Sequence, residues 1–145
     1  MTKKENLHIV LRVREEESRL AEKDGITVLN RTKLRVEQCA GSPGIAEIEF
    51  DHIWGREATQ RDIFTSIQSA CDDVIQGYNA SIVSCGFSKS GKSYSLHGTT
   101  SVPGVIQHAM TQVFQNLEAI CDREFILELR CMKIHENELT DLLDR

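Results

Sequence analysis

The segment that most constrains this chain is a glycine-rich run, Gly86-Phe87-Ser88-Lys89-Ser90-Gly91-Lys92-Ser93. It fits the pattern G-x-x-x-x-G-K-[ST] at every required position. Residues 81–85 before it are an apolar run typical of a buried strand, and the polar residues after it can begin a helix. A loop in that setting directs successive backbone N–H groups at phosphate oxygens. The segment therefore predicts a phosphate-binding loop in an α/β fold.

Each part of the loop has an expected role in binding a nucleoside triphosphate. The backbone of residues 86–93 would surround the phosphates, Lys92 would reach the β- and γ-phosphates, and the Ser93 hydroxyl would ligate Mg²⁺. The expected ligand is accordingly ATP or ADP with Mg²⁺. The alternative is a surface turn rich in glycine, serine and lysine, which the strand and helix on either side make less favourable.

Composition and charge narrow the class of protein. The chain has 145 residues, 40% of them hydrophobic and 27% charged, which is ordinary for one globular domain covering residues 1–145. Its net charge of −5 argues against nucleic acid as a partner, because such proteins usually carry a basic patch. There is no signal-like N-terminus and no apolar span of about 18 residues, so we expect no membrane insertion. Five cysteines without a C-x-x-C spacing favour reduced, buried thiols and a cytoplasmic location.

Strands and helices are expected to alternate along the chain. A capping box at Thr59-x-x-Asp62 predicts the start of a helix whose apolar face continues to Ile75 and which ends at Gly77. A second helix is expected over residues 105–120. This alternation predicts an α/β sheet flanked by helices, with the phosphate site at the carboxyl end of a strand. The expected strands are residues 7–14, a hairpin of 25–29 and 33–36, then 46–50, 81–85 and 125–134, with a short last element over 138–143.

The residues on both sides of the loop carry a wider pattern. Residues 77–98 read GYNASIVSCGFSKSGKSYSLHG, which resembles the kinesin motor domain, where GYN leads through a strand into a loop of the type GQTGSGKT and then YTM-x-G. The resemblance spans nearly the whole chain and implies a P-loop NTPase-type sheet that is incomplete, the N-terminal half of a kinesin-like motor domain. Weaker matches fall in the family's order at residues 12–14 (R-x-R-P), 50–54 (F-D-x-V-F), 104–106 (G-I-I) and 132–143 (F-E-I-Y ending in D-L-L).

The resemblance also implies a wall on the base side of the nucleotide. Arg12, Arg14 and Tyr94 match the residues that lie beside the adenine in that family. Two departures fall in the same region: Lys89 stands where most of the family has glycine, and Glu15 replaces the proline of R-x-R-P. Lys89 adds a cation near the phosphates, and a positive φ would strain its backbone.

The function implied by the resemblance is that of an ATP-dependent microtubule motor. Microtubules are then the expected partner, and the cytoskeleton the expected location, of the full-length protein. The family's switch motifs N-x-x-S-S-R and D-x-A-G-x-E do not occur in the sequence, so no catalytic residue is assigned. For residues 1–145 alone we expect no microtubule-stimulated ATPase activity, and unpaired sheet edges with poor solubility.

Two alternatives to a motor stay open. One is a nucleotide-binding module or motor remnant that does not hydrolyse its ligand. The other, less favoured, is an unrelated phosphate-loop kinase, whose loop would usually follow the first strand of the chain.

Overall fold

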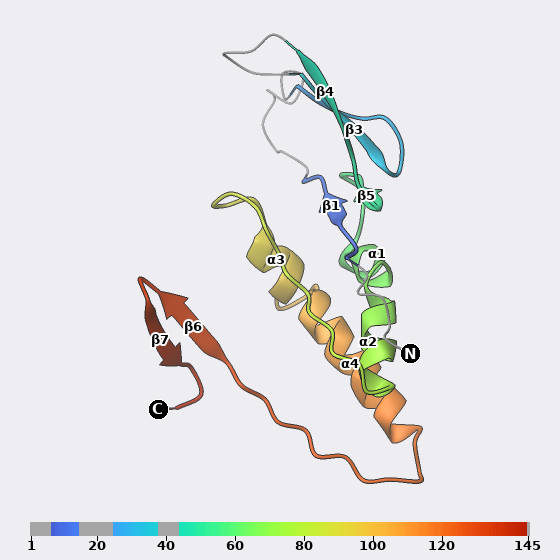
Figure 1. Cartoon of the computed structure of the whole chain (residues 1–145), viewed down its shortest axis with the longest axis vertical. Coiled ribbons are helices and arrows are strands. Elements are labelled where there is room, and N and C mark those ends of the chain that lie inside the picture. The colour runs from blue at the N-terminus through green and yellow to red at the C-terminus, as the bar shows by residue number, and fades with distance from the viewer. Residues whose placement is uncertain (1–6, 15–24, 38–43, 145) are drawn as a thin grey trace.

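The computed structural model describes residues 7–14, 25–37 and 44–144, and it is elongated (Figure 1). A three-stranded sheet lies at one end, a short parallel pair of strands joins it to a layer of helices, and a hairpin projects to the side. Glu15 lies outside the described residues. The elements are, in chain order, β1 (Val10–Arg12), β2 (Ile26–Val28), β3 (Lys33–Glu37), β4 (Ile45–Glu49), β5 (His52–Trp54), α1 (Gln60–Thr65), α2 (Gln68–Ile75), α3 (Lys92–His97), α4 (Val105–Glu118), β6 (Met132–His135) and β7 (Glu138–Asp141).

Strand β1 pairs in parallel with β5, so that its last residue, Arg12, lies opposite Trp54. Only the centre of the strand predicted over residues 7–14 forms this ladder. Ile53, in the middle of β5, is 4% exposed and anchors the pair in the core. The pairing fixes the place where the Arg12 side chain leaves the backbone.

The N-terminal sheet is antiparallel in the order β2-β3-β4, which confirms the predicted hairpin. Its turn is closed by the side chain of Asn30, whose Oδ1 accepts 2.8 Å hydrogen bonds from the N–H groups of Thr32 and Lys33. Asparagine favours such turns because its side chain can bond backbone groups two and three residues on. Leu34 of the central strand β3 is 5% exposed.

The predicted capping box at the start of α1 is confirmed. The Asp62 N–H donates to the Thr59 hydroxyl oxygen at 3.2 Å, and the Asp62 carboxylate accepts from the Thr59 N–H at 2.9 Å. These two bonds satisfy backbone donors that the first turn of a helix leaves without partners. Gly77 follows the end of α2, in agreement with the predicted stop.

The prediction of one continuous helix between these points is wrong, because α1 and α2 are separate. The Ser66 and Ile67 N–H groups donate to the carbonyl oxygens of Ile63 and Phe64, at 3.2 Å and 2.9 Å, which makes tight turns in place of the α-helical pattern. The break coincides with a tertiary contact: the indole Nε1 of Trp54 donates to the Ser66 hydroxyl at 2.7 Å. Apolar spacing along the chain does not reveal such a contact.

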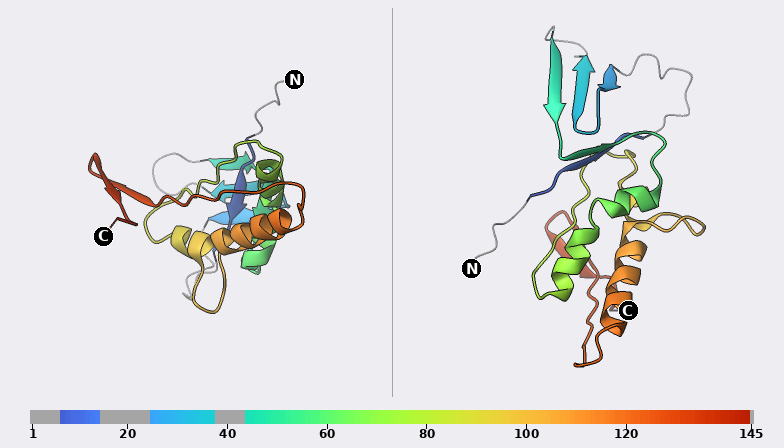
Figure 2. Two further views of the ribbon diagram at one scale, coloured as in Figure 1. Left: turned by 90° about the horizontal axis from the view of Figure 1, so that it is seen from below. Right: turned by 90° about the vertical axis from the view of Figure 1, so that its right-hand side faces the viewer.

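Helix α4, predicted over residues 105–120, packs against α1, α2 and α3, and Figure 2 shows it running beside α1 and α2. The Phe64 ring stacks on the His108 imidazole, with ring centroids 5.5 Å apart. None of the helices that the structure describes is long and apolar enough to cross a membrane. The buried hydrophobic residues of this layer are Ile63, Phe64, Cys71 and Val105.

Two predicted strands are not formed as expected. Residues 81–85 make no ladder with any described strand and are mostly exposed. Of residues 125–134, only those from Met132 onward pair, as β6 in a hairpin with β7, and the part before them is extended without a partner (Figure 1). An apolar run shows that a segment suits a sheet, but a strand also needs a neighbour for its N–H and C=O groups.

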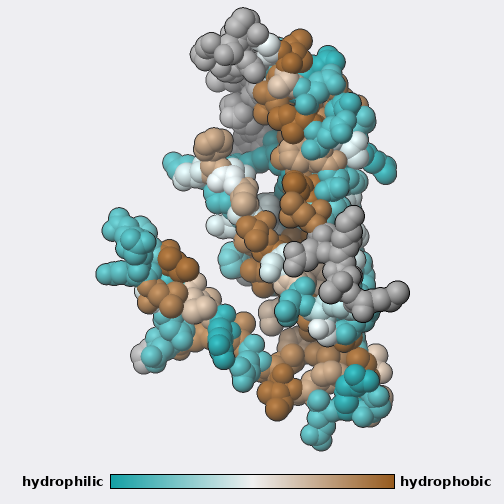
Figure 3. Space-filling model, viewed as in Figure 1, coloured by the Kyte–Doolittle hydropathy of each residue, from teal (hydrophilic) through white to brown (hydrophobic). Residues whose placement is uncertain are grey.

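Hydrophobic side chains are exposed in the segments that lack strand partners, as expected for unpaired sheet edges. Val83 is 78% exposed, Ile126 92% and Leu129 70%. Figure 3 shows hydrophobic residues on the surface from one end of the molecule to the other, including the projecting hairpin. Such surface favours association in solution.

The described cysteines are all free thiols, and only Cys71 among them is buried. The expectation of buried thiols is therefore wrong for Cys85, Cys121 and Cys131. Cys85 and Cys131 belong to the segments without strand partners, and Cys121 follows the end of α4, so no other element covers them. Cys39 lies outside the described residues.

Candidate functional site

The predicted phosphate loop runs into α3, which begins at Lys92. Two glycines in it adopt conformations that side chains disfavour. Gly91 precedes the helix with φ of 97°, and Gly86 has φ of 150°. A Cβ on Gly86 would also come within 2.6 Å of the Ser90 hydroxyl oxygen. Glycine is required at both positions for the loop to turn into the helix, which gives the motif its physical basis here.

The ammonium of Lys92 folds back onto its own loop. Its Nζ donates a 2.7 Å hydrogen bond to the Gly86 carbonyl oxygen and a 2.6 Å bond to the Phe87 carbonyl oxygen. The Ser90 N–H donates to the same Phe87 carbonyl at 3.2 Å and closes the turn. The Phe87 ring is 91% exposed, so this residue contributes its backbone to the loop. Phosphate oxygens are stronger acceptors for an ammonium than neutral carbonyls, so these partners can be exchanged for a phosphate.

The loop is also connected to the end of β1. Lys89 adopts φ of 63°, the left-handed conformation, so the condition under which a lysine here would strain the backbone is met. Its carbonyl oxygen accepts a 3.0 Å hydrogen bond from Arg14 Nη1. The Arg14 Cδ lies 3.9 Å from where a Cβ of Gly91 would be, so the arginine stem runs along the loop.

The structure brings two of the predicted base-side residues into direct contact. The Arg12 guanidinium lies over the Tyr94 ring, with Cζ 5.1 Å from the ring centroid. Its Nη1 donates 2.9 Å hydrogen bonds to the Ser95 hydroxyl and to Gln60 Oε1. The cation–π contact and the two hydrogen bonds give the guanidinium plane one orientation. A flat cation beside an aromatic ring is a surface on which a heteroaromatic base can stack.

Gln60 is a functional candidate that the sequence did not indicate. It is the first residue of α1 and only 3% exposed. Besides accepting from Arg12, its side-chain amide donates from Nε2 to the Tyr94 carbonyl oxygen at 2.5 Å. A glutamine at the start of a helix is normally a surface residue, so no sequence signal marks its burial.

The start of α3 suits a magnesium-bound phosphate group. Its first internal hydrogen bond runs from the Ser95 N–H to the Gly91 carbonyl oxygen, at 2.9 Å. The N–H groups of Lys92, Ser93 and Tyr94 therefore have no acceptor within the helix. Ser93 is exposed there, and its hydroxyl is an oxygen ligand of the kind that Mg²⁺ takes. Lys92, Ser93 and the helix start thus fit the group that the motif predicts.

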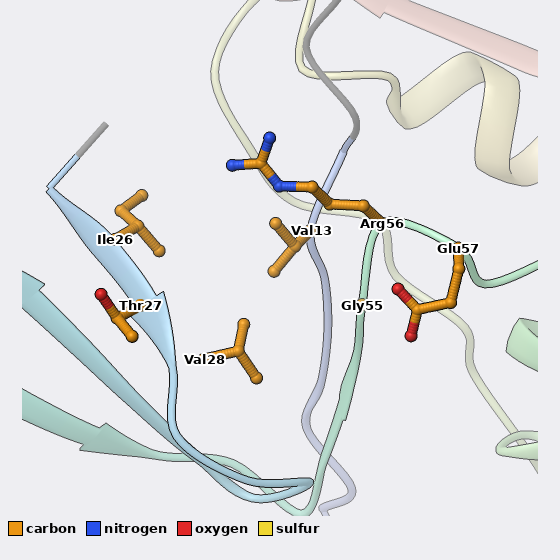
Figure 4. Close-up of a pocket in the computed structure, with 7 residues that line it drawn as sticks. All are labelled: Val13, Ile26, Thr27, Val28, Gly55, Arg56 and Glu57. Carbon is orange, nitrogen blue, oxygen red and sulfur yellow. The ribbon is translucent and has the colours of Figure 1, made fainter. Parts of the chain in front are cut away.

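Two cavities lie away from the loop. The larger, of about 380 Å³, lies between β2 and the residues that follow β1 and β5. Figure 4 shows Ile26 and Val28 on one side of it, with Val13, Arg56 and Glu57 across from them. The second, of about 230 Å³, lies between α1 and α4. Neither contains a predicted site residue, and the described residues contain no group of three or more His, Cys, Asp or Glu side chains suited to hold a metal ion.

Comparison with known proteins identifies the family to which the chain is similar. The kinesin motor domain model matches residues 11–145. Kinesin-like protein KIN-7I of Oryza sativa subsp. japonica is 34% identical over 96 residues, which are 66% of this chain and 8% of that protein. Centromere-associated protein E of Homo sapiens is 35% identical over 101 residues, 69% of this chain and 4% of that protein.

A solved structure supports the same placement. The structure of a fast kinesin matches with a TM-score of 0.83 and 26% identity, over 94% of this chain and 40% of that one. The chain thus spans well under half of the solved structure and only a small part of the two relatives. Because the family model covers nearly every residue and the fold agrees, the chain belongs to the kinesin motor domain family.

Proposed function

We propose that this chain is the nucleotide-binding part of an ATP-dependent microtubule motor, and that it binds Mg·ATP or Mg·ADP through residues 86–93. The full-length protein would then move along microtubules and reside in the cytoplasm on the cytoskeleton. The observation that carries the proposal is the position of Lys92, whose ammonium bonds the Gly86 and Phe87 carbonyls at 2.7 Å and 2.6 Å beside the start of α3. Family membership supports it and gives no support to an unrelated phosphate-loop kinase.

The geometry of the loop supports the proposed binding roles. Lys92 exchanges its two carbonyl partners for oxygens of the β- and γ-phosphates, and the N–H groups at the start of α3 donate to the same anion. Ser93 holds Mg²⁺, which neutralises phosphate charge when bound. Lys89 adds an exposed cation on the loop, close to the bound anion.

The base is proposed to lie against the contact between Arg12 and Tyr94. The Arg12 Cζ lies 5.1 Å from the centroid of the Tyr94 ring, so the two side chains present a cationic and an aromatic surface side by side. Arg14 is proposed as the third member of this wall, which is supported by its hydrogen bond to the Lys89 carbonyl of the phosphate loop.

Replacing Lys92 by alanine tests the proposal. Loss of a charge-assisted contact worth about 1.5–3 kcal/mol should weaken binding of a fluorescent ADP analogue by about tenfold or more. Lys133→Ala, on the exposed strand β6, is a matched control that should bind like wild type. Equal binding by wild type and Lys92→Ala would show that the loop does not hold the phosphates.

A further inference from the structure

We infer that Gln60 is a positioning residue for the base side of the nucleotide site; this inference rests on the proposed function. Among the described residues, the hydrogen-bond partners of the Gln60 side chain are Arg12 Nη1 and the Tyr94 carbonyl oxygen, neither of which belongs to residues 86–93. It acts instead on Arg12 and Tyr94, the pair on which the base is proposed to stack. Its effect should therefore depend on whether the ligand has a base.

The position of Gln60 is set by the start of α1. The reciprocal hydrogen bonds of Thr59 and Asp62 fix the first turn of that helix, and Gln60 follows the cap as its first residue. The side chain is 3% exposed, so its amide is out of reach of bulk water. A buried amide that lost its partners would be costly, and this one has a protein partner at each end.

The two ends of the Gln60 amide form hydrogen bonds with two different elements, β1 and α3. Oε1 accepts the 2.9 Å hydrogen bond from Arg12 Nη1, which belongs to β1. Nε2 donates the 2.5 Å hydrogen bond to the Tyr94 carbonyl oxygen, which belongs to α3. One side chain thus sets the distance between the strand that carries Arg12 and the helix that carries Tyr94.

The orientation of the Arg12 guanidinium depends on the same amide. Nη1 has two partners, Gln60 Oε1 and the Ser95 hydroxyl, both at 2.9 Å. Without the amide, the guanidinium keeps one neutral, partly exposed hydroxyl and can rotate away from the Tyr94 ring. The stacking surface would then have to be ordered by each ligand as it binds, which lowers affinity for a base.

The experiment compares two ligands, ADP and inorganic tripolyphosphate, the second of which has phosphates but no base. Gln60→Met keeps the side-chain length and removes both hydrogen bonds. We expect it to weaken ADP binding about fivefold or more and to leave tripolyphosphate binding within about twofold of wild type. Gln60→Glu keeps an acceptor for Arg12 and should recover most of the ADP affinity. Gln76→Met, at an exposed position after α2, is the matched control and should change neither.

Every result of this comparison either supports or overturns the positioning role of Gln60. Equal weakening of ADP and tripolyphosphate would show a general structural role, and no weakening of either would show no role; both results overturn the inference. If Gln60→Met does not fold by circular dichroism, Gln60→Asn, whose shorter amide cannot reach both partners, carries the same expectation. The proposed function fails separately, if wild type binds neither ligand or Lys92→Ala binds both as wild type does.

Discussion

Arg14 Nη1 donates a 3.0 Å hydrogen bond to the carbonyl oxygen of Lys89, 75 residues further along the chain. The bond joins the end of β1 to the one residue of the phosphate loop that adopts the left-handed conformation without being glycine. The arginine that resembles a base-side residue of the family therefore also supports the backbone of the loop. The contact with the loop is shown by the structure, whereas the base-side role rests on the resemblance to the family and is a proposal.

Removing the guanidinium should loosen the loop. Arg14→Met keeps the stem along Gly91 but loses the bond to Lys89, which is exposed and so worth about 0.5–1.5 kcal/mol. We expect faster amide exchange at residues 87–91 and about two- to tenfold weaker binding of a fluorescent ADP analogue. Arg130→Met removes an exposed arginine whose partner is Glu128 and is the control. Unchanged exchange in the loop would contradict the supporting role.

Replacing Lys89 by glycine should relieve the backbone strain at this position. Because φ is 63°, Lys89→Gly should stabilise the chain by up to about 1 kcal/mol in urea unfolding. Lys89→Ala removes the charge but keeps the strain, and it should leave stability close to wild type. If the alanine variant weakens nucleotide binding and the glycine variant does so equally, the lost affinity belongs to the ammonium. A glycine variant less stable than the alanine variant would argue against strain at this position.

The capping box of Thr59 and Asp62 at the start of α1 should make the free energy of unfolding depend on pH. The Thr59 hydroxyl, and then the Thr59 N–H, hydrogen-bond the Asp62 carboxylate and hold its pKa below the ordinary value. A carboxyl group with a lowered folded pKa contributes stability above its unfolded pKa of about 3.9, and loses it as pH falls through the folded value. Urea midpoints from pH 7 downward should therefore fall more for wild type than for Asp62→Asn. Thr59→Val, which removes only the hydroxyl, should show an intermediate fall, and parallel curves for all three would rule the cap out as the cause.

The features that the sequence predicted correctly are local. The Thr59 and Asp62 cap, the turn at Asn30 and the change from loop to helix at Gly91 each depend on residues within a few positions of one another. The sequence raised a positive φ at Lys89 only as a condition, and the structure shows that it is met. Short-range hydrogen bonds and backbone sterics are sufficient to specify all of these.

The features that the sequence missed depend on distant partners. The break between α1 and α2 coincides with the bond from Trp54 to Ser66, and the burial of Gln60 depends on Arg12, 48 residues away. Residues 81–85 have the composition of a strand but no described neighbour with which to form one. The periodicity of apolar residues shows which face of a segment is hydrophobic. The helix break, the burial of Gln60 and the pairing of residues 81–85 depend instead on which distant residues pack against that segment.

The thiol of Cys71 should be the least reactive of the described cysteines. Burial raises its pKa, and the neighbouring Asp72 carboxylate raises it further, so less of the nucleophilic thiolate is present at neutral pH. Cys85, Cys121 and Cys131 are exposed. Brief treatment with N-ethylmaleimide, followed by peptide mass spectrometry, should label these three at least about tenfold faster than Cys71. In urea the four rates should come close together, because burial, the larger cause of the difference, is lost on unfolding and only the neighbouring Asp72 carboxylate remains. Rapid labelling of Cys71 in the native chain would mean that this packing opens readily in solution.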